Sequence, residues 1–247
     1  MLNARFFSTI AHIRDLPTDS HREVAFAGRS NAGKSSAINI IANQKRLAFA
    51  SKTPGRTQHL NFFETQAGRF LVDLPGYGFA KAPFTQQRAW QQLIGGYLAD
   101  RRQLVGLVLI MDIRHPLTDL DRHLLNWFRP TGKPIHILLS KADKISRGQA
   151  MQVLRAVQTE LSDAGFTARV QIFSSTHRIG LDEAEAIIRQ WLDMVKPSKE
   201  APAADLVADL VADSVANSAA NLASEPNPMP PDSATLQPPV QDPQATP

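Results

Sequence analysis

Short apolar runs alternate with longer segments of helical periodicity along most of this chain. Runs typical of buried strands occur at 24–27, 60–65, 69–73, 104–112, 135–139 and 169–173. Apolar residues spaced three and four apart predict helices at 36–42, 86–102, 118–128, 149–164 and 181–194. Strands that alternate with helices, some of them apolar throughout, predict an α/β fold: a mostly parallel sheet with helices on both faces.

Local signals predict how these elements begin and connect. Gln66-Ala67-Gly68 separates two predicted strands, which indicates a hairpin. Thr118, with Asp121 three residues later, resembles a capping box at a helix start. Small and polar residues with a Pro-Gly pair predict a long loop at 45–58, and a second loop follows at 74–79. Loops as long as the first are usually functional or disordered in compact domains.

The composition changes after Pro197. Residues 198–247 hold nine of the 17 prolines and no aromatic residue, and they consist mainly of Ala, Pro, Ser and Asp. Such a segment cannot bury enough apolar surface to offset the entropy lost on ordering. We therefore expect a folded domain at 1–197, which includes the N-terminal segment, and a disordered acidic tail at 198–247.

The net charge of +4 hides an asymmetry between these two parts. Residues 198–247 carry one base against seven acids, a net charge of −6, whereas residues 1–197 carry 26 bases against 16 acids, a net charge of +10. A basic body predicts a polyanionic partner, and a merely solubilising surface is the alternative.

Missing residue types exclude some chemistry. The chain has no cysteine, which excludes disulfides, thiolate metal sites and cysteine nucleophiles. No apolar run approaches the roughly 20 residues that a transmembrane helix needs. We expect a cytoplasmic protein with no membrane partner.

A glycine-rich segment lies between the strand at 24–27 and the helix at 36–42. It matches the pattern G-x-x-x-x-G-K-[ST] and consists of Gly28, Arg29, Ser30, Asn31, Ala32, Gly33, Lys34 and Ser35. Backbone N–H groups and a helix N-terminus surround an anion in such a loop. We expect Lys34 to reach the β- and γ-phosphates of a nucleoside triphosphate, and Ser35 to bind Mg²⁺. A chance glycine turn is the alternative, and the strand and helix on either side disfavour it.

A second motif ends the strand at 69–73. Asp73, Leu74, Pro75 and Gly76 form a D-x-x-G sequence. We expect the Asp73 carboxylate to meet Mg²⁺ through water and the Gly76 N–H to meet the γ-phosphate. By itself the motif is a weak indication of nucleotide binding, and the phosphate loop before it strengthens that indication.

A third motif indicates the base. Ser140, Lys141, Ala142 and Asp143 directly follow the strand at 135–139. A carboxylate accepts both donors on one edge of guanine, whereas adenine cannot pair with Asp143 in that way, and the Lys141 stem can lie along the base. An ordinary polar loop with a capping residue is the alternative. After the last strand, the backbone N–H groups of Phe173, Ser174 and Ser175 could meet the guanine oxygen.

These motifs, in this order, resemble the translation-factor-related GTPases. Residues 28–36, 53–58 and 73–78 are similar specifically to the EngB family of the TrmE-Era-EngA-EngB-Septin-like superfamily, and the resemblance covers about residues 5–195. It implies a P-loop NTPase G domain at 1–197. It also implies a bacterial GTPase that is needed for large ribosomal subunit assembly and for normal cell division and septation.

The resemblance adds further site residues. It implies that Thr57 reaches Mg²⁺ in the GTP state, with Ser35 as the other protein ligand. The nucleotide-binding positions that it adds are Gly55, Arg56, Thr57, Gln58 and His59. One departure is Ser140, where the family usually has Thr and most GTPases have Asn. Because serine keeps the hydroxyl, we expect guanine recognition to survive with a weaker tie to the phosphate loop.

The groups that support hydrolysis are less completely defined. Ras-type GTPases orient water with a glutamine directly after D-x-x-G, where this chain has Tyr77. Asn31 matches the asparagine with which related GTPases hold a potassium ion near the phosphates, and the alternative is a loop residue that bonds its own backbone. We expect Lys34, Thr57, Gly76 and Asn31 to form the catalytic set.

Three functions fit these features to different degrees. The leading one is a monomeric GTP-hydrolysing switch, slow without a ribosomal partner, that binds GTP or GDP and docks on the RNA of the large ribosomal subunit or its precursor. The second is a GTP-gated RNA- or ribosome-binding scaffold with negligible intrinsic hydrolysis, which Tyr77 favours. The third is an ATP-using P-loop phosphotransferase, which Asp143 disfavours.

Overall fold

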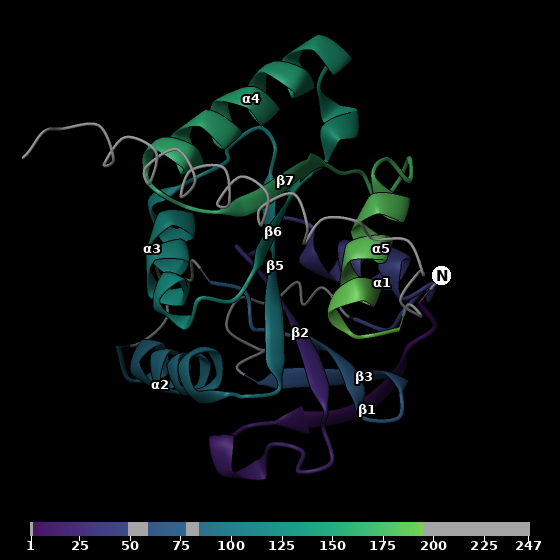
Figure 1. Ribbon diagram of the computed structural model, residues 1–247, viewed down its shortest axis with the longest axis vertical. Coiled ribbons are helices and arrows are strands. Elements are labelled where there is room, and N and C mark those ends of the chain that lie inside the picture. The colour runs from purple at the N-terminus through teal and green to yellow at the C-terminus, as the bar shows by residue number, and fades with distance from the viewer. Residues whose placement is uncertain (1, 49–58, 78–83, 195–247) are drawn as a thin grey trace, which may run out of the picture. The chain divides into compact units, whose positions relative to one another are not determined.

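A seven-stranded sheet runs through the computed structural model of the chain, in the order β1-β3-β4-β2-β5-β6-β7 (Figure 1). The structure describes residues 2–48, 59–77 and 84–194, with the backbone alone for 84–91. All of these residues belong to one unit. The predicted tail at 198–247 and the side chain of Trp90 lie outside the described part.

Most of the sheet is parallel. β2, β4, β5, β6 and β7 run in one direction, β3 pairs antiparallel with β4, and β1 pairs antiparallel with β3. The strands are β1 Arg5–Ile10, β2 Arg22–Gly28, β3 Leu60–Gln66, β4 Arg69–Asp73, β5 Leu104–Asp112, β6 Ile135–Ser140 and β7 Ala168–Ile172. Because the carboxyl ends of parallel strands meet at one edge of a sheet, all three predicted motifs start from the same edge.

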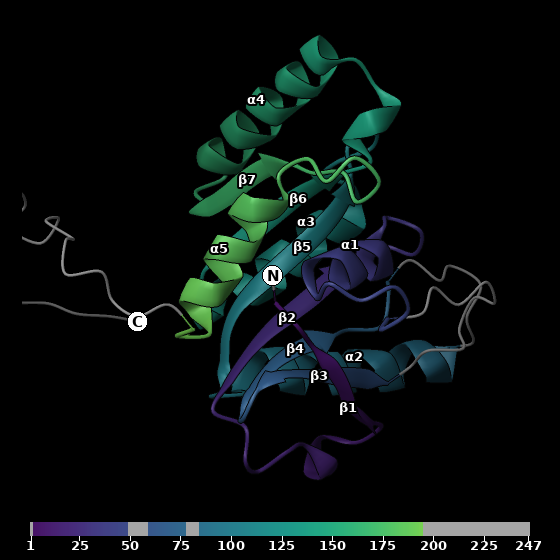
Figure 2. The ribbon, with the colours of Figure 1, turned by 90° about the vertical axis from the view of Figure 1, so that its right-hand side faces the viewer.

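Helices cover both faces of this sheet. They are α1 Lys34–Ile41, α2 Phe84–Asp100, α3 Asp119–Phe128, α4 Arg147–Asp163 and α5 Leu181–Trp191. One apolar cluster joins the sheet to α2, α3 and α4, and a second joins it to α1 and α5 (Figures 1 and 2). In β5, Leu109 and Met111 belong to the first cluster and Val108 and Ile110 to the second, which is why this strand is apolar nearly throughout. The α/β fold predicted from the sequence is confirmed.

Capping residues decide where two of the helices begin. Asp121 at α3 accepts a hydrogen bond from the Thr118 N–H at 2.9 Å, as the predicted capping box requires, and a further one from the Thr118 hydroxyl at 2.7 Å. Ser146 and Gln149 form a second capping box, so α4 begins at Arg147 rather than at the predicted residue 149. Both boxes satisfy N–H groups that a helix start leaves without partners.

The other predicted boundaries agree to within a few residues. The hairpin joins β3 to β4 as expected. α2 and α5 end at Asp100 and Trp191, slightly before the predicted ends at 102 and 194. Within the described ranges, no helix has the length and hydrophobicity needed to cross a membrane.

β1 is the main element that the sequence pattern did not identify. Phe6 and Phe7 are 57% and 41% exposed, and the pairing with β3 is irregular between Phe6 and Ser8. The segment therefore lacks the two-residue alternation by which a half-buried strand is identified. The two rings nevertheless pack edge-on against Phe63 of β3 and Phe70 of β4. This strand is stabilised by its neighbours rather than by its own apolar pattern.

Candidate nucleotide-binding site

The predicted phosphate loop connects the end of β2 to the start of α1. Gly33 has a φ of 104°, a left-handed conformation that is strained for residues with a side chain. A Cβ at Gly28 would lie 2.7 Å from the Ile110 carbonyl oxygen, so glycine is what lets β2 approach β5 this closely. Asn31 also has a positive φ, 65°, which asparagine tolerates better than most residues. The loop conformation therefore depends on the residue types of the motif.

Lys34 and Asp73 meet at the phosphate end of this site. The Lys34 ammonium forms an ion pair with Oδ1 of Asp73, and the two side chains are only 11% and 5% exposed. Ser35 lies beside Lys34 in the first turn of α1. The Ser35 hydroxyl and the Asp73 carboxylate are hard oxygen donors, the type that Mg²⁺ prefers together with phosphate oxygens. This donor set fits a Mg²⁺-bound nucleotide.

Part of the predicted site lies outside the described residues. These positions are Gly55, Arg56, Thr57 and Gln58. His59 is described, and it is exposed directly before β3.

The residues that follow Asp73 are held against the core and the phosphate loop. Leu74 is 2% exposed, and its N–H donates to the Phe26 carbonyl oxygen at 3.0 Å. Pro75 is also buried, whereas Gly76 is partly accessible next to Ser30. The Leu74 and Pro75 side chains therefore fix the strand end, and the backbone at Gly76 is the part of the motif that is near the loop.

Tyr77 makes hydrogen bonds with the phosphate loop and with α3. Its carbonyl oxygen accepts a hydrogen bond from the Ser30 N–H at 3.0 Å, and its hydroxyl donates to Oδ1 of Asp121 at 2.6 Å. The residue is 6% exposed, and burial, followed by the Asp121 carboxylate, raises the pKa of the phenol far above its usual range. The Tyr77 hydroxyl therefore links the D-x-x-G segment to α3 and stays protonated.

Ser140 connects the end of β6 to the phosphate loop. It is 3% exposed, and its Oγ lies 2.5 Å from the Ala32 carbonyl oxygen and 3.0 Å from that of Met111. The serine hydroxyl thus spans directly to the phosphate loop, although its side chain is shorter than the asparagine of most GTPases.

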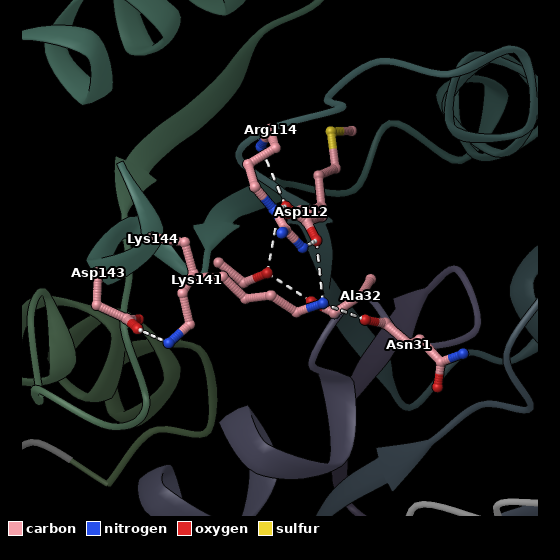
Figure 3. Close-up of polar contacts among 9 residues, drawn as sticks. Asn31, Ala32, Asp112, Arg114, Lys141, Asp143 and Lys144 are labelled. Carbon is pink, nitrogen blue, oxygen red and sulfur yellow. Dashed lines mark hydrogen bonds and ion pairs between the residues drawn. The ribbon is translucent and has the colours of Figure 1, made fainter. Parts of the chain in front are cut away.

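Lys141 makes a second connection to the same loop (Figure 3). Its backbone is left-handed, with a φ of 58°. Its Nζ donates to the Asn31 carbonyl oxygen at 2.5 Å and to Oδ2 of Asp112 at 2.9 Å. The side chain therefore crosses from the end of β6 to the phosphate loop, as a platform for a base requires. Within the described part of the chain, the Asn31 hydrogen bond to Lys141 uses the backbone carbonyl oxygen, and the Asn31 side-chain amide makes no hydrogen bond.

The Asp143 carboxylate is ionised and partnered. Ser174 donates its hydroxyl to Oδ1 at 2.6 Å, and the Lys144 ammonium lies 3.0 Å from Oδ2. The hydrogen bond from Ser174, and then the contacts with Lys144, lower the pKa of Asp143 to about 2. The group is thus an acceptor at neutral pH, as recognition of the two guanine donors needs.

The three predicted residues after β7 have different environments. Phe173 is fully buried, and its N–H donates to the Leu139 carbonyl oxygen at 2.9 Å. The Ser174 N–H donates to the Ile179 carbonyl oxygen at 3.0 Å. Neither N–H is free for a guanine oxygen, so the prediction is wrong for these two amides in this conformation. The Ser175 N–H has no partner in the described ranges and is the remaining candidate.

A cavity of about 220 Å³ lies beside the phosphate loop. Its lining includes residues 29–32, the end of β5, and the side chains of Arg114, Asp121 and Lys141. Sequence reasoning did not assign Asp112 or Asp121 to the site. Asp112 ends a buried apolar strand, as Asp73 does, and this placement was the signal that could have identified it.

Fold and site together define the class of this protein: a P-loop NTPase with the G-domain architecture. A family model described as "50S ribosome-binding GTPase" matches residues 23–141. The "Probable GTP-binding protein EngB" of Dechloromonas aromatica (strain RCB) is 59% identical over 199 residues, which cover 80% of this chain and 90% of that protein. The protein of the same name from Thiobacillus denitrificans (strain ATCC 25259 / T1) is 59% identical over 189 residues, which cover 76% and 91%. The chain belongs to the EngB family of GTP-binding proteins.

Solved structures agree with this fold. A crystal structure of a probable GTP-binding protein engB aligns with a TM-score of 0.56 at 20% identity, and covers 70% of this chain and all of that one. Era, in a crystal structure with MgGDPNP and nucleotides 1506–1542 of 16S ribosomal RNA, aligns with the same TM-score and identity over 73% of this chain and 59% of Era. At these identities the likeness shows the fold alone.

Proposed function

We propose that this chain hydrolyses GTP as a switch in the assembly of the large ribosomal subunit. The observation that carries the proposal is the convergence of the base loop on the phosphate loop, through Ser140 at Ala32 and Lys141 at Asn31. The description of the matching family model and the net charge of +10 on residues 1–197 support a ribosomal partner. Loss of such an activity would impair cell division and septation indirectly, through the supply of ribosomes.

Guanine recognition is assigned to the loops after β6 and β7. The ionised Asp143 carboxylate accepts the ring N–H and the amine of guanine, and Ser174 keeps it oriented through the 2.6 Å hydrogen bond. The Lys141 stem supports the face of the base. We assign the guanine oxygen to the Ser175 N–H, which has no backbone partner in the described ranges.

Phosphate binding is assigned to Lys34 and the loop before it. Lys34 exchanges its ion pair with Asp73 for the β- and γ-phosphate oxygens when the nucleotide enters. Ser35 and Thr57 would hold Mg²⁺, which neutralises phosphate charge as hydrolysis proceeds. The Gly76 N–H would donate a hydrogen bond to the γ-phosphate, so the segment after Gly76 would change position when that phosphate is lost.

Water activation is the step for which this chain offers fewest groups. The Tyr77 hydroxyl is bonded to Asp121 and does not act as a glutamine would. We assign to the Asn31 amide the binding of a potassium ion beside the phosphates, where the ion supplies positive charge. The same observation on Tyr77 favours the second candidate function, a GTP-gated scaffold that scarcely hydrolyses GTP by itself.

Turnover measurements separate the two candidates. Steady-state GTP hydrolysis is measured with the full chain alone and with purified large ribosomal subunits, and small subunits serve as the control. The proposal expects slow hydrolysis alone and a clear increase with large subunits only. A rate that stays at background with either subunit would contradict the hydrolytic switch and support the scaffold.

A further inference from the structure

We propose that Asp112 is a positioning residue for Lys141, and that it holds the lysine side chain across the phosphate loop before any base is bound. The inference rests on the proposed guanine site, because it concerns how the base platform of that site is prepared. It assigns a role to Asp112 and Arg114, two residues outside the motifs for nucleotide binding.

The sheet places Asp112 beside the base loop. Asp112 is the last residue of β5 and pairs in register with Ser140, the last residue of β6. The residue after Ser140 is Lys141, so a side chain at the end of β5 can reach it across one strand spacing. Figure 3 shows the Asp112 carboxylate between Arg114 on one side and Lys141 on the other.

Two acceptors fix the Lys141 ammonium. Asp112 Oδ2 lies 2.9 Å from Nζ, and the Asn31 carbonyl oxygen lies 2.5 Å from it. The Lys141 side chain is 31% exposed, so part of its stem remains accessible to a ligand. A lysine side chain otherwise has large rotamer freedom, which a ligand must restrict on binding. Fixing the stem in advance removes that cost from nucleotide binding.

Arg114 in turn fixes Asp112. Its Nε donates to Oδ1 at 2.9 Å, its Nη2 to Oδ2 at 2.7 Å, and its backbone N–H to Oδ1 at 3.1 Å. Side-chain hydrogen bonding from Arg114, and then from Lys141, lowers the pKa of Asp112 below its usual range. Planar two-point pairing of this kind fixes orientation as well as distance. The Asp112 carboxylate is therefore a rigid, permanently charged acceptor for Lys141.

A simpler role for Asp112 is to stabilise the turn after β5, without any effect on Lys141. The Arg114 N–H bonds its side chain and the His115 N–H bonds its carbonyl oxygen, as such a turn would require. A double-mutant cycle distinguishes the two roles, because a positioning effect must act through Lys141 and a turn effect need not.

The test measures GDP affinity by isothermal titration for wild type, Asp112→Asn, Lys141→Met and the double variant. We expect Asp112→Asn to weaken GDP binding about five- to tenfold, since hydrogen bonds to charged groups contribute in that range and partial exposure reduces the effect. We expect Lys141→Met to weaken it more, and the double variant to equal Lys141→Met. Asp119→Asn, the same change at an exposed carboxylate nearby, is the matched control and should leave the affinity unchanged.

The outcomes separate the inference from the function on which it rests. A wild type that does not bind GDP would overturn the proposed function and the inference together. A wild type that binds GDP, with an Asp112→Asn effect that is absent or equally large in the Lys141→Met background, would overturn the inference alone. If Asp112→Asn folds poorly, Arg114→Gln replaces it, with an expected loss of about threefold that again disappears in the Lys141→Met background.

Discussion

The site has a base end, formed by the loops after β6 and β7, and a phosphate end, formed by the phosphate loop and Asp73. The two ends differ in how many of their contacts must change when a nucleotide binds. At the base end, Ser140, Lys141 and Asp143 each have a partner in the phosphate loop or in the loop after β7. At the phosphate end, Lys34 is occupied by Asp73. The contacts at the base end hold its side chains in orientations that guanine recognition can use, whereas Lys34 at the phosphate end must exchange its partner when a nucleotide binds.

This difference suits a switch. A base that is recognised in the same way in the GTP and GDP states keeps the nucleotide bound through the cycle. Contacts that change only at the phosphates can then report whether the γ-phosphate is present. The following predictions test this division of the site, from the largest expected effect to the smallest.

The largest effect is expected from Asp143→Asn at the base end. The new amide offers a donor where guanine also has one, whereas the extra carbonyl of xanthine can accept from it. We expect the ratio of GDP to XDP affinity to fall by about 10⁴-fold, because a site that satisfies a polar edge rejects an analogue that leaves it unpaired. Calorimetry with both nucleotides measures the ratio. A preference for GDP in the variant as strong as in the wild type would contradict the assignment.

Lys34→Met is the corresponding change at the phosphate end. We expect GDP affinity to fall about 100-fold, through the loss of charge-assisted hydrogen bonds to phosphate. Asp73 is left buried without its cation, so unfolding should become easier by about 3–5 kcal/mol. The double variant Lys34→Met/Asp73→Asn should recover most of this stability and none of the affinity. Recovery of affinity in the double variant would show that Lys34 serves Asp73 rather than phosphate.

Hydrolysis should depend on the monovalent cation. We expect single-turnover GTP hydrolysis to be about tenfold faster in potassium chloride than in sodium chloride, because a potassium ion held by the Asn31 amide would stabilise transition-state charge and the smaller sodium ion would fit the same ligands less well. Asn31→Ala should remove the difference and leave GDP affinity largely unchanged. Equal rates of the wild type in the two salts would contradict the potassium site.

Tyr77→Phe tests the link from the D-x-x-G segment to α3. Removing the hydroxyl leaves Asp121 with its two hydrogen bonds from Thr118, so we expect a loss of about 1–2 kcal/mol in unfolding free energy. Tyr97→Phe is a matched control that lies away from the site. The Tyr97 hydroxyl donates a hydrogen bond of 2.9 Å to the buried Glu23. Both variants should melt earlier by similar amounts. Only Tyr77→Phe should raise the affinity for a GTP analogue relative to GDP, by about threefold, since Gly76 is then freer to move.

The smallest effect concerns the pH dependence of the base end. The pKa of Asp143 is lowered from 3.8 to about 2, so the carboxylate stays ionised, and its contribution is present above pH 3.8 and lost as the pH falls through 2. Ser174→Ala removes the main cause of this shift. We expect the GDP affinities of the two proteins to change in parallel from pH 8 to 4.5, where the terminal phosphate of the nucleotide titrates, and the variant alone to lose further affinity near pH 4, as measured by titration at each pH. An identical acid limb in both proteins would contradict the role of Ser174.

Sequence reasoning predicted the parts of this molecule that local pattern determines. The apolar β5 follows from burial on both faces, and the capping box of Thr118 and Asp121 follows from spacing within one helix turn. β1 could not be predicted in this way, because Phe6 and Phe7 lack alternation and pack on strands that come much later in the chain.

The contacts that distinguish the two ends of the site were also beyond sequence reasoning. Tyr77 and Asp121 are 44 positions apart, and Asp112 and Lys141 are 29 apart. Each pair meets because the sheet order brings two chain segments together, and neither the composition nor the spacing of these residues indicates the partner. Motifs predicted which residues bind the nucleotide, and the fold showed which residues contact them.

The central claim, a GTP-dependent action on the large ribosomal subunit, is tested most directly by cosedimentation. The full chain is centrifuged with large subunits in the presence of GDP or of a non-hydrolysable GTP analogue, at matched moderate salt so that nonspecific RNA binding is reduced. Lys34→Met serves as the variant that cannot exchange its phosphate contacts. We predict that the wild type sediments with large subunits much more strongly with the GTP analogue than with GDP, and that Lys34→Met shows no difference. Equal sedimentation of the wild type with the two nucleotides would contradict the account.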